Sequence, residues 1–312
     1  MNPAASVIFF TVASGAGYGL AAGLILYGLF GPVGFDPAIS QSGFILALIL
    51  IVAGLLSSLF HLGHPERAWR ALSQWRTSWL SREGFFALIT FLPLLVFAAS
   101  WVIWDKPNLL AGVLALMGIL ATVWSTAMIY ASLKPIRRWR NGFTGPAYLA
   151  LGAASGSMLM ALLFRMYGVQ DWVVALAPVP LLAGAAIVKS MYWRWMTSTA
   201  SNSTPETATG LGSLGSVRLL EAPHTEENYL LKEMGYQIAR KHAAKLRWLT
   251  MDFGFIAPLI LVVITTQAGS LAGSFMMILA TLLVFFGCAT ERWLFFAEAK
   301  HSVTLYYGAD QV

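Results

Sequence analysis

Residues 107–133 read PNLLAGVLALMGILATVWSTAMIYASL, an apolar run bounded by Lys106 and Lys134 in which no Asp, Glu, Lys or Arg occurs. A helix crosses a hydrocarbon core about 30 Å thick with roughly 20 apolar residues, because each residue adds about 1.5 Å. This run is therefore long enough to span a membrane.

The rest of the chain repeats this pattern. Only 11% of its 312 residues are charged and 58% are hydrophobic, against about 25% and 45–50% in an average soluble domain. This composition excludes an ordinary soluble protein. Six further runs lack a charged residue: 1–35, 37–60, 84–104, 141–164, 172–188 and 253–290.

The number of spans follows from the lengths of these runs. The last one would be about 57 Å long as a single helix, so Gln267–Ser270 near its middle is interpreted as a turn between two helices. The sequence therefore predicts an all-α fold, a polytopic membrane protein in which residues 1–312 form one bundle of eight transmembrane helices. The predicted spans are 6–30, 40–61, 83–104, 108–132, 145–167, 174–196, 249–268 and 272–296. Pro178 and Pro180 make the sixth the least regular.

The basic residues predict the orientation. Of the 20 Lys and Arg residues, 18 fall on one side of this topology, and only Lys106 and Arg165 fall on the other. Because loops rich in Lys and Arg stay in the cytoplasm, both termini are predicted to be cytoplasmic. The apolar N-terminus has no basic region before it, so it is interpreted as the first span and not as a signal peptide.

One long cytoplasmic loop is predicted, at about 197–247. Its first part, Thr197–Ser216, is rich in Ser, Thr and Gly and is typical of a flexible linker. From Thr225 onward, Leu230, Met234 and Ile238 recur every four residues, which predicts an amphipathic helix. That helix either lies on the membrane or bundle surface or docks a soluble partner, and the sequence leaves both interpretations open.

Residues that could bind a metal cofactor are scarce. The single cysteine, Cys288, is too few for an iron–sulfur cluster or a structural zinc site. None of the five histidines lies in the middle of a span, so we expect no haem and no metal on this chain. The acidic residues Asp252 and Glu291, at the cytoplasmic ends of the last two spans, either join a functional site or pair with neighbouring basic residues, and the pairing is favoured.

The segment 58–83 concentrates the polar side chains that could carry chemistry. His61 closes the second span and Glu83 opens the third, so the loop between the spans could place both at one pocket. A quinone headgroup needs a hydrogen-bond donor or proton carrier beside an apolar slot, and histidine titrates near neutrality. His61 and Glu83 are therefore predicted to bind quinone and relay protons. Supporting roles for Arg67, Arg82 and His64 compete with simple headgroup and loop contacts.

Several stretches also resemble a known family. His61-Leu-Gly63, followed by Pro65 and Arg67, and then Leu80-Ser-Arg-Glu83, resemble the membrane anchor subunits of dimethyl sulfoxide reductase type, the DmsC family. Residues 6–19 and 218–242 resemble the branch found with quinone-linked sulfite dehydrogenases. The segment His64-Pro-Glu66 differs from the reductase version, which leaves the roles of His64 and Glu66 open.

The resemblance implies a function. Such anchors lie in the bacterial cytoplasmic (inner) membrane, bind no haem, and hold a quinone, either ubiquinone or menaquinone. The site lies next to a ferredoxin-like iron–sulfur subunit that serves a molybdopterin catalytic subunit. In the family, a histidine and a glutamate that match His61 and Glu83 are implicated in quinol handling. Soluble subunits of the sulfite-oxidising complexes are cytoplasmic, which agrees with the predicted orientation.

The main hypothesis is therefore a membrane anchor and quinone-reacting subunit that passes electrons from cytoplasmic sulfite oxidation to the quinone pool. The first alternative is the anchor of a dimethyl-sulfoxide-reductase-type complex that oxidises quinol. A purely structural anchor and a transporter are alternatives from other classes. A transporter is disfavoured, because the spans hold almost no charge away from their ends and no clear repeat is present.

Overall fold

The computed structural model describes residues 3–32, 37–199, 203–221 and 238–310. Within these residues the protein is helical and contains no strand. The described residues include eight helices that are long and apolar enough to cross a membrane. The predicted all-α class and the predicted number of spans are both confirmed.

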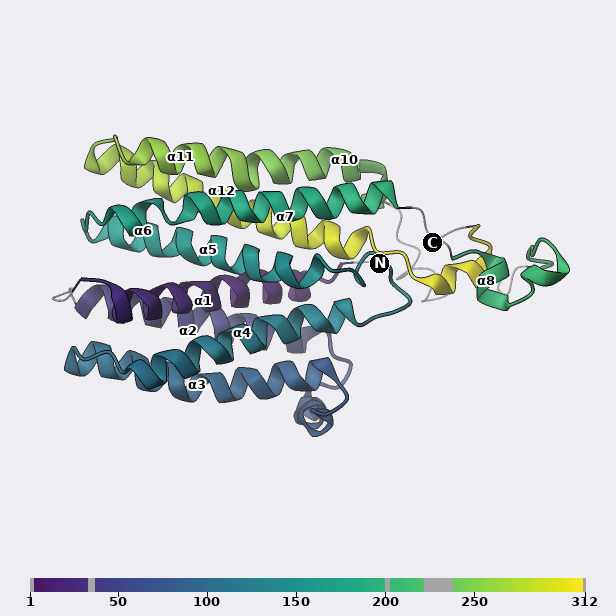
Figure 1. Ribbon diagram of the computed structural model, residues 1–312, viewed down its shortest axis with the longest axis horizontal. Coiled ribbons are helices and arrows are strands. Elements are labelled where there is room, and N and C mark those ends of the chain that lie inside the picture. The colour runs from purple at the N-terminus through teal and green to yellow at the C-terminus, as the bar shows by residue number, and fades with distance from the viewer. Residues whose placement is uncertain (1–2, 33–36, 200–202, 222–237, 311–312) are drawn as a thin grey trace.

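The long helices form two layers that lie side by side (Figure 1). The first layer holds α1 (Ala5–Phe30), α2 (Pro37–Ser57), α3 (Trp79–Trp104) and α4 (Leu109–Ala131). The second layer holds α5 (Thr144–Met166), α6 (Trp172–Leu176), α7 (Pro178–Ser198), α10 (Ile238–Met251), α11 (Ala257–Thr265) and α12 (Ser270–Ala297).

The two layers join where α1 packs against α5. A Cβ atom added at Gly19 would lie 2.0 Å from the carbonyl oxygen of Gly152, and one at Gly156 would lie 2.2 Å from the carbonyl carbon of Gly19. Only glycine fits such a contact between backbones, as in other membrane helices that pack through small residues. The glycines of α1 and α5 therefore fix how closely the layers approach.

The second, third and seventh spans start earlier than predicted, with α2 beginning at Pro37, α3 at Trp79 and α10 at Ile238. The third begins at Trp79, four residues earlier than predicted, because Ser78 caps it by accepting a bond from the Ser81 amide. The seventh contains a π-helical turn, Asp252–Ile256, just before Pro258, and such a turn accommodates a helix irregularity. The sixth is broken between α6 and α7, as its prolines predict.

One end of the bundle holds most of the polar connections (Figure 1). There α1 begins, α12 ends, and α2, α4 and α7 run into the segments that carry most of the basic residues. We call it the basic end. Lys106 and Arg165 belong to the opposite end, where α3 meets α4 and where α5 ends.

The predicted linker is partly helical. It contains α8 (Pro205–Thr209) and the 3₁₀ turn η3 (Gly212–Leu214). The α8 turn packs against η5 (Ser302–Tyr307), where the Tyr306 hydroxyl donates to the Ala208 carbonyl at 2.7 Å. The amphipathic helix predicted from Thr225 lies outside the described residues as far as position 237.

Candidate functional site

Glu83 lies inside the bundle, on the second turn of α3. Its side chain is 6% exposed, although the sequence analysis placed it at the very start of a span. The hydroxyl of Thr126 on α4 donates to Glu83 Oε1 at 2.5 Å. Packing of α3 on α4 brings these two residues together. Because α3 begins at Trp79, Glu83 lies on its second turn and not at its first residue, as the prediction had it.

The other neighbours of Glu83 are neutral. Tyr18 of α1 is buried and close enough to interact electrostatically with Glu83. Along α4, Thr122 lies one turn before Thr126, and its hydroxyl lies 3.4 Å from that of Thr90 on α3. In the part of the protein that the structure describes, Glu83 forms no ion pair. Among the described residues, the site is thus a buried carboxyl group that accepts a hydrogen bond from one hydroxyl, that of Thr126.

The connection between α2 and α3 packs against α3 beside Glu83. It contains the 3₁₀ turns η1 (Ser58–His61) and η2 (Pro65–Gln74). The Ser81 hydroxyl donates to the Ala71 carbonyl and accepts from the Gln74 amide, so two residues of η2 bind the first turn of α3. A Cβ on Gly84 would lie 2.9 Å from Leu72, which shows how closely η2 covers this turn.

Arg82 holds the end of the same connection. Its guanidinium donates to the Trp75 carbonyl at 3.0 Å and to the Arg76 carbonyl at 2.7 Å, and its Cζ lies 4.3 Å from the centre of the Trp79 ring. These contacts bind Arg82 to the α2–α3 connection, and its supporting role at a quinone site stays a prediction.

His64 and Arg67 lie on the surface. Their side chains are 69% and 58% exposed, and both bind Glu66, with His64 Nδ1 at 3.0 Å and Arg67 Nε at 3.7 Å from the same carboxylate oxygen. The structure therefore groups His64 and Arg67 with Glu66 at the surface, whereas Glu83 is buried.

His61 closes η1, which packs against α1 and α2. Its side chain lies outside what the structure describes. The turn η1 packs against η2, and η2 packs against α3. The backbones of His61 and Glu83 therefore lie in the same part of the bundle, around the α2–α3 connection. The role of His61 in quinone binding stays a prediction.

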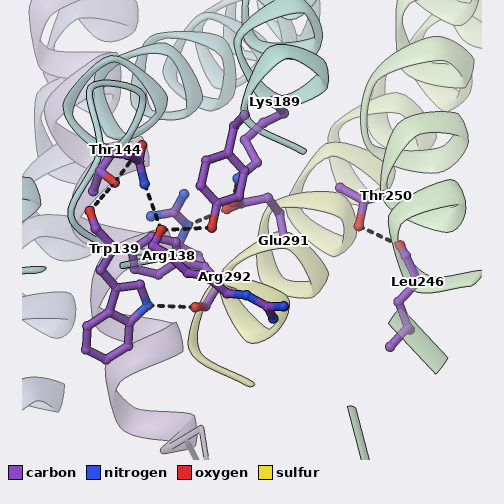
Figure 2. A network of polar contacts seen from close by, with 11 residues as sticks. Arg138, Trp139, Thr144, Lys189, Leu246, Thr250, Glu291 and Arg292 are labelled. Atoms are coloured by element: carbon purple, nitrogen blue, oxygen red, sulfur yellow. Dashed lines mark hydrogen bonds and ion pairs between the residues drawn. The ribbon is translucent and has the colours of Figure 1, made fainter. Parts of the chain in front are cut away.

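A second polar cluster lies in the other layer (Figure 2). Lys189 of α7 is 1% exposed and its Nζ lies 2.5 Å from Oε1 of Glu291 on α12, which is fully buried. The other oxygen of Glu291 accepts from Nε of Arg292, which is 3% exposed. We call Lys189, Glu291 and Arg292 the buried triad. It confirms that Glu291 pairs with basic residues.

Neighbouring bonds tie the buried triad to the connection between α4 and α5. The Trp139 indole donates to the Phe295 carbonyl at 2.8 Å, and the Tyr192 hydroxyl donates to the Arg138 carbonyl at 3.1 Å. Just past α12, Glu298 pairs with Arg247. The sequence analysis used Lys189 only as a topology signal. A lysine inside an apolar run was the signal for a buried ion pair.

These features define the class of protein: a membrane-integral helical bundle with buried carboxyl groups towards its basic end. The family model described as "DMSO reductase anchor subunit (DmsC)" matches residues 1–308. The chain belongs to the DmsC family.

Two relatives agree with this membership. A sulfite dehydrogenase subunit of Allochromatium vinosum is 36% identical, over 98% of this protein and 99% of that one. A subunit of the anaerobic dimethyl sulfoxide reductase of Escherichia coli is 26% identical, over 42% of this protein and 46% of that one. The protein is thus similar to anchor-type subunits of complexes that contain other polypeptides.

Proposed function

We propose that this protein is the membrane anchor and quinone-reacting subunit of a sulfite-oxidising complex, and that it passes electrons to the quinone pool. The difference between the two similarities supports the sulfite branch. The similarity to a sulfite dehydrogenase subunit runs over nearly the whole of both sequences, whereas that to a dimethyl sulfoxide reductase subunit extends over less than half of each. In the alternative, a reductase anchor, electrons would flow the other way.

The observation that carries the quinone proposal is the buried carboxyl of Glu83 with one hydroxyl partner. A quinone takes up protons together with electrons, so its site needs a group that gives and receives protons. Glu83 has no bound cation among the described residues to hold it ionised. It can therefore hold a proton on Oε2 while Oε1 stays on Thr126. Carboxyl groups at such positions within membrane spans are functional by default.

The remaining residues would serve this carboxyl. His61 would hydrogen-bond a quinone oxygen or hand it a proton, since imidazole exchanges protons near neutral pH. Arg82 would keep the α2–α3 connection closed over the start of α3 through its bonds to the Trp75 and Arg76 carbonyls. Apolar side chains of the spans would accommodate the isoprenoid tail.

We further propose that the basic end faces the cytoplasm of a bacterium, with the protein in the inner membrane. The charge asymmetry supports this orientation. An iron–sulfur subunit would bind there, beside the α2–α3 connection, and a molybdopterin subunit would bind to that partner. Gentle purification should recover these subunits together with molybdenum and iron. Recovery of this protein alone and without metal, still moving a solute into vesicles, would contradict the proposal and favour a transporter.

The test of the quinone site uses the assembled complex. We expect His61→Ala to abolish most sulfite-dependent quinone reduction while the partner subunits stay bound. His64→Ala is the matched control, because that side chain is exposed and binds Glu66. The turnover is measured with a water-soluble quinone, together with binding of a quinone analogue. Unchanged turnover and analogue binding in His61→Ala would refute the assignment and leave a purely structural anchor.

A further inference from the structure

A small cavity lies beside the buried triad, where α1, α5 and α12 meet. Its volume is about 20 Å³, and its polar lining consists of Thr11, Tyr148, Ser155, Cys288 and Arg292. A cavity of this volume has room for one or two particles of the size of water. Two lining residues of α1, Val12 and Gly15, are only partly buried, so the cavity is not sealed from the surface.

Arg292 brings unused hydrogen-bond donors to this cavity. Its Nε is bound to Glu291. Its terminal nitrogens, Nη1 and Nη2, are buried and have no hydrogen-bond partner among the described residues, and the same holds for the Tyr148 hydroxyl. The guanidinium carbon lies 4.1 Å from the centre of the Tyr148 ring. A buried donor without an acceptor costs free energy of folding. The cavity has room for an acceptor that the two terminal nitrogens could bind.

The positive charge beside the cavity is only partly balanced among the described residues. Lys189 and Arg292 share the single carboxylate of Glu291, which leaves the buried triad with one excess positive charge when all three are ionised. The nearby carboxylate of Glu298 is already bound to Arg247. A buried charge needs a compensating charge close by. A negatively charged occupant of the cavity would supply it.

The lining fits an anion better than a cation. All its polar side chains can donate a hydrogen bond, and none is a carboxylate. The Thr11 and Ser155 hydroxyls now donate to carbonyls of their own helices, at 3.0 Å to Val7 and 2.7 Å to Leu151. The nitrogen and oxygen donors of the lining that have no partner among the described residues are those of Arg292 and Tyr148.

We propose that this cavity binds one small monovalent anion of halide size, held by the guanidinium of Arg292 and the hydroxyl of Tyr148. The volume excludes larger oxyanions. The anion would neutralise the buried triad at the junction of the two layers, and this role is independent of the quinone chemistry proposed for Glu83.

The test compares thermal unfolding of the purified complex, with the full-length protein, in sodium bromide and in sodium gluconate at equal ionic strength. Gluconate is too large for the cavity. A bound ion stabilises the folded state by mass action, so we expect the midpoint of this subunit to be at least about 2 °C higher in bromide. The bromide should also give an anomalous scattering peak beside Arg292 in crystals.

Three variants separate the site from a general salt effect. Gly15→Ala narrows the cavity without touching the buried triad, because its Cβ would contact only Gly152, at 3.8 Å. Gly184→Ala is the matched control, since no atom lies within 4 Å of its added Cβ. We expect the bromide effect to persist in Gly184→Ala and to disappear in Gly15→Ala and in Arg292→Gln. Equal midpoints in the two salts for the unaltered protein, or a full bromide effect in Gly15→Ala, would overturn the proposal.

Discussion

Two buried glutamates, Glu83 and Glu291, lie towards the basic end of the bundle in opposite surroundings. Glu83 is bound by one neutral hydroxyl, that of Thr126. Glu291 is bound by two cations, Lys189 and Arg292, one on each oxygen. Among the described residues, the first carboxyl has no cation beside it, whereas the second is paired on both oxygens. The comparison supports the proposed chemical role of Glu83 and a structural role for Glu291.

The largest expected effect is on stability, from Glu291→Gln. The change would leave Lys189 and Arg292 buried without the carboxylate that they share, and removing one member of a buried ion pair costs about 3–5 kcal/mol. We expect the free energy of unfolding in detergent to fall by that amount. In Glu83→Gln it should change by less than about 1 kcal/mol, because the amide oxygen still accepts from Thr126. Equal losses in both variants would remove the distinction between the two sites.

The next effect is on activity, from Glu83→Gln. The amide cannot carry a proton, and loss of a general acid or base lowers rates by about 10²–10⁴-fold. We expect quinone-dependent turnover of the assembled complex to fall at least about 100-fold. The control is Glu206→Gln, which changes a partly buried carboxylate of α8, outside the spans, that accepts from the Val217 amide. If Glu83→Gln turns over quinone as fast as this control, Glu83 is structural.

The sequence predicted the spans well where bilayer thickness sets the length of the apolar run. The first predicted span, 6–30, agrees with α1 to within one residue, and 108–132 agrees equally well with α4. The start of α3 was predicted four residues late, because the prediction took the charges at Arg82 and Glu83 as the end of the membrane. The Ser78 cap and the bonds of Ser81 extend the helix beyond that point.

The polar contacts were harder to predict, because they depend on how distant helices pack. Glu83 was found from its place in a polar segment, but its partner Thr126 is one of several hydroxyls on an apolar helix. Lys189 and Glu291 are about a hundred residues apart, and only the packing of α5, α7 and α12 brings them together. The position of Lys189 inside a span indicates that it has a partner, but no local pattern identifies Glu291 as that partner.

A smaller effect is expected from Thr126→Val, which keeps the shape of the side chain and removes the bond to Glu83. One hydrogen bond of about 1 kcal/mol corresponds to a change of about fivefold in rate. Turnover with quinone should fall by about that factor, and Thr126→Ser should restore it. If Thr126→Val turns over quinone as fast as Thr126→Ser, the Thr126 hydroxyl does not position the Glu83 carboxyl.

The smallest effects are expected from replacing two arginines of the α2–α3 connection, Arg82 and Arg67. Arg82 binds two carbonyls and the Trp79 ring, whereas Arg67 is 58% exposed and touches only Glu66 among the ion pairs described. Arg82→Ala should lower the free energy of unfolding by about 1 kcal/mol. Arg67→Ala should change it by less than about 0.5 kcal/mol, since exposed ion pairs contribute little, and should leave turnover within about twofold. A tenfold loss of turnover in Arg67→Ala, with stability unchanged, would instead place this exposed arginine at the quinone site.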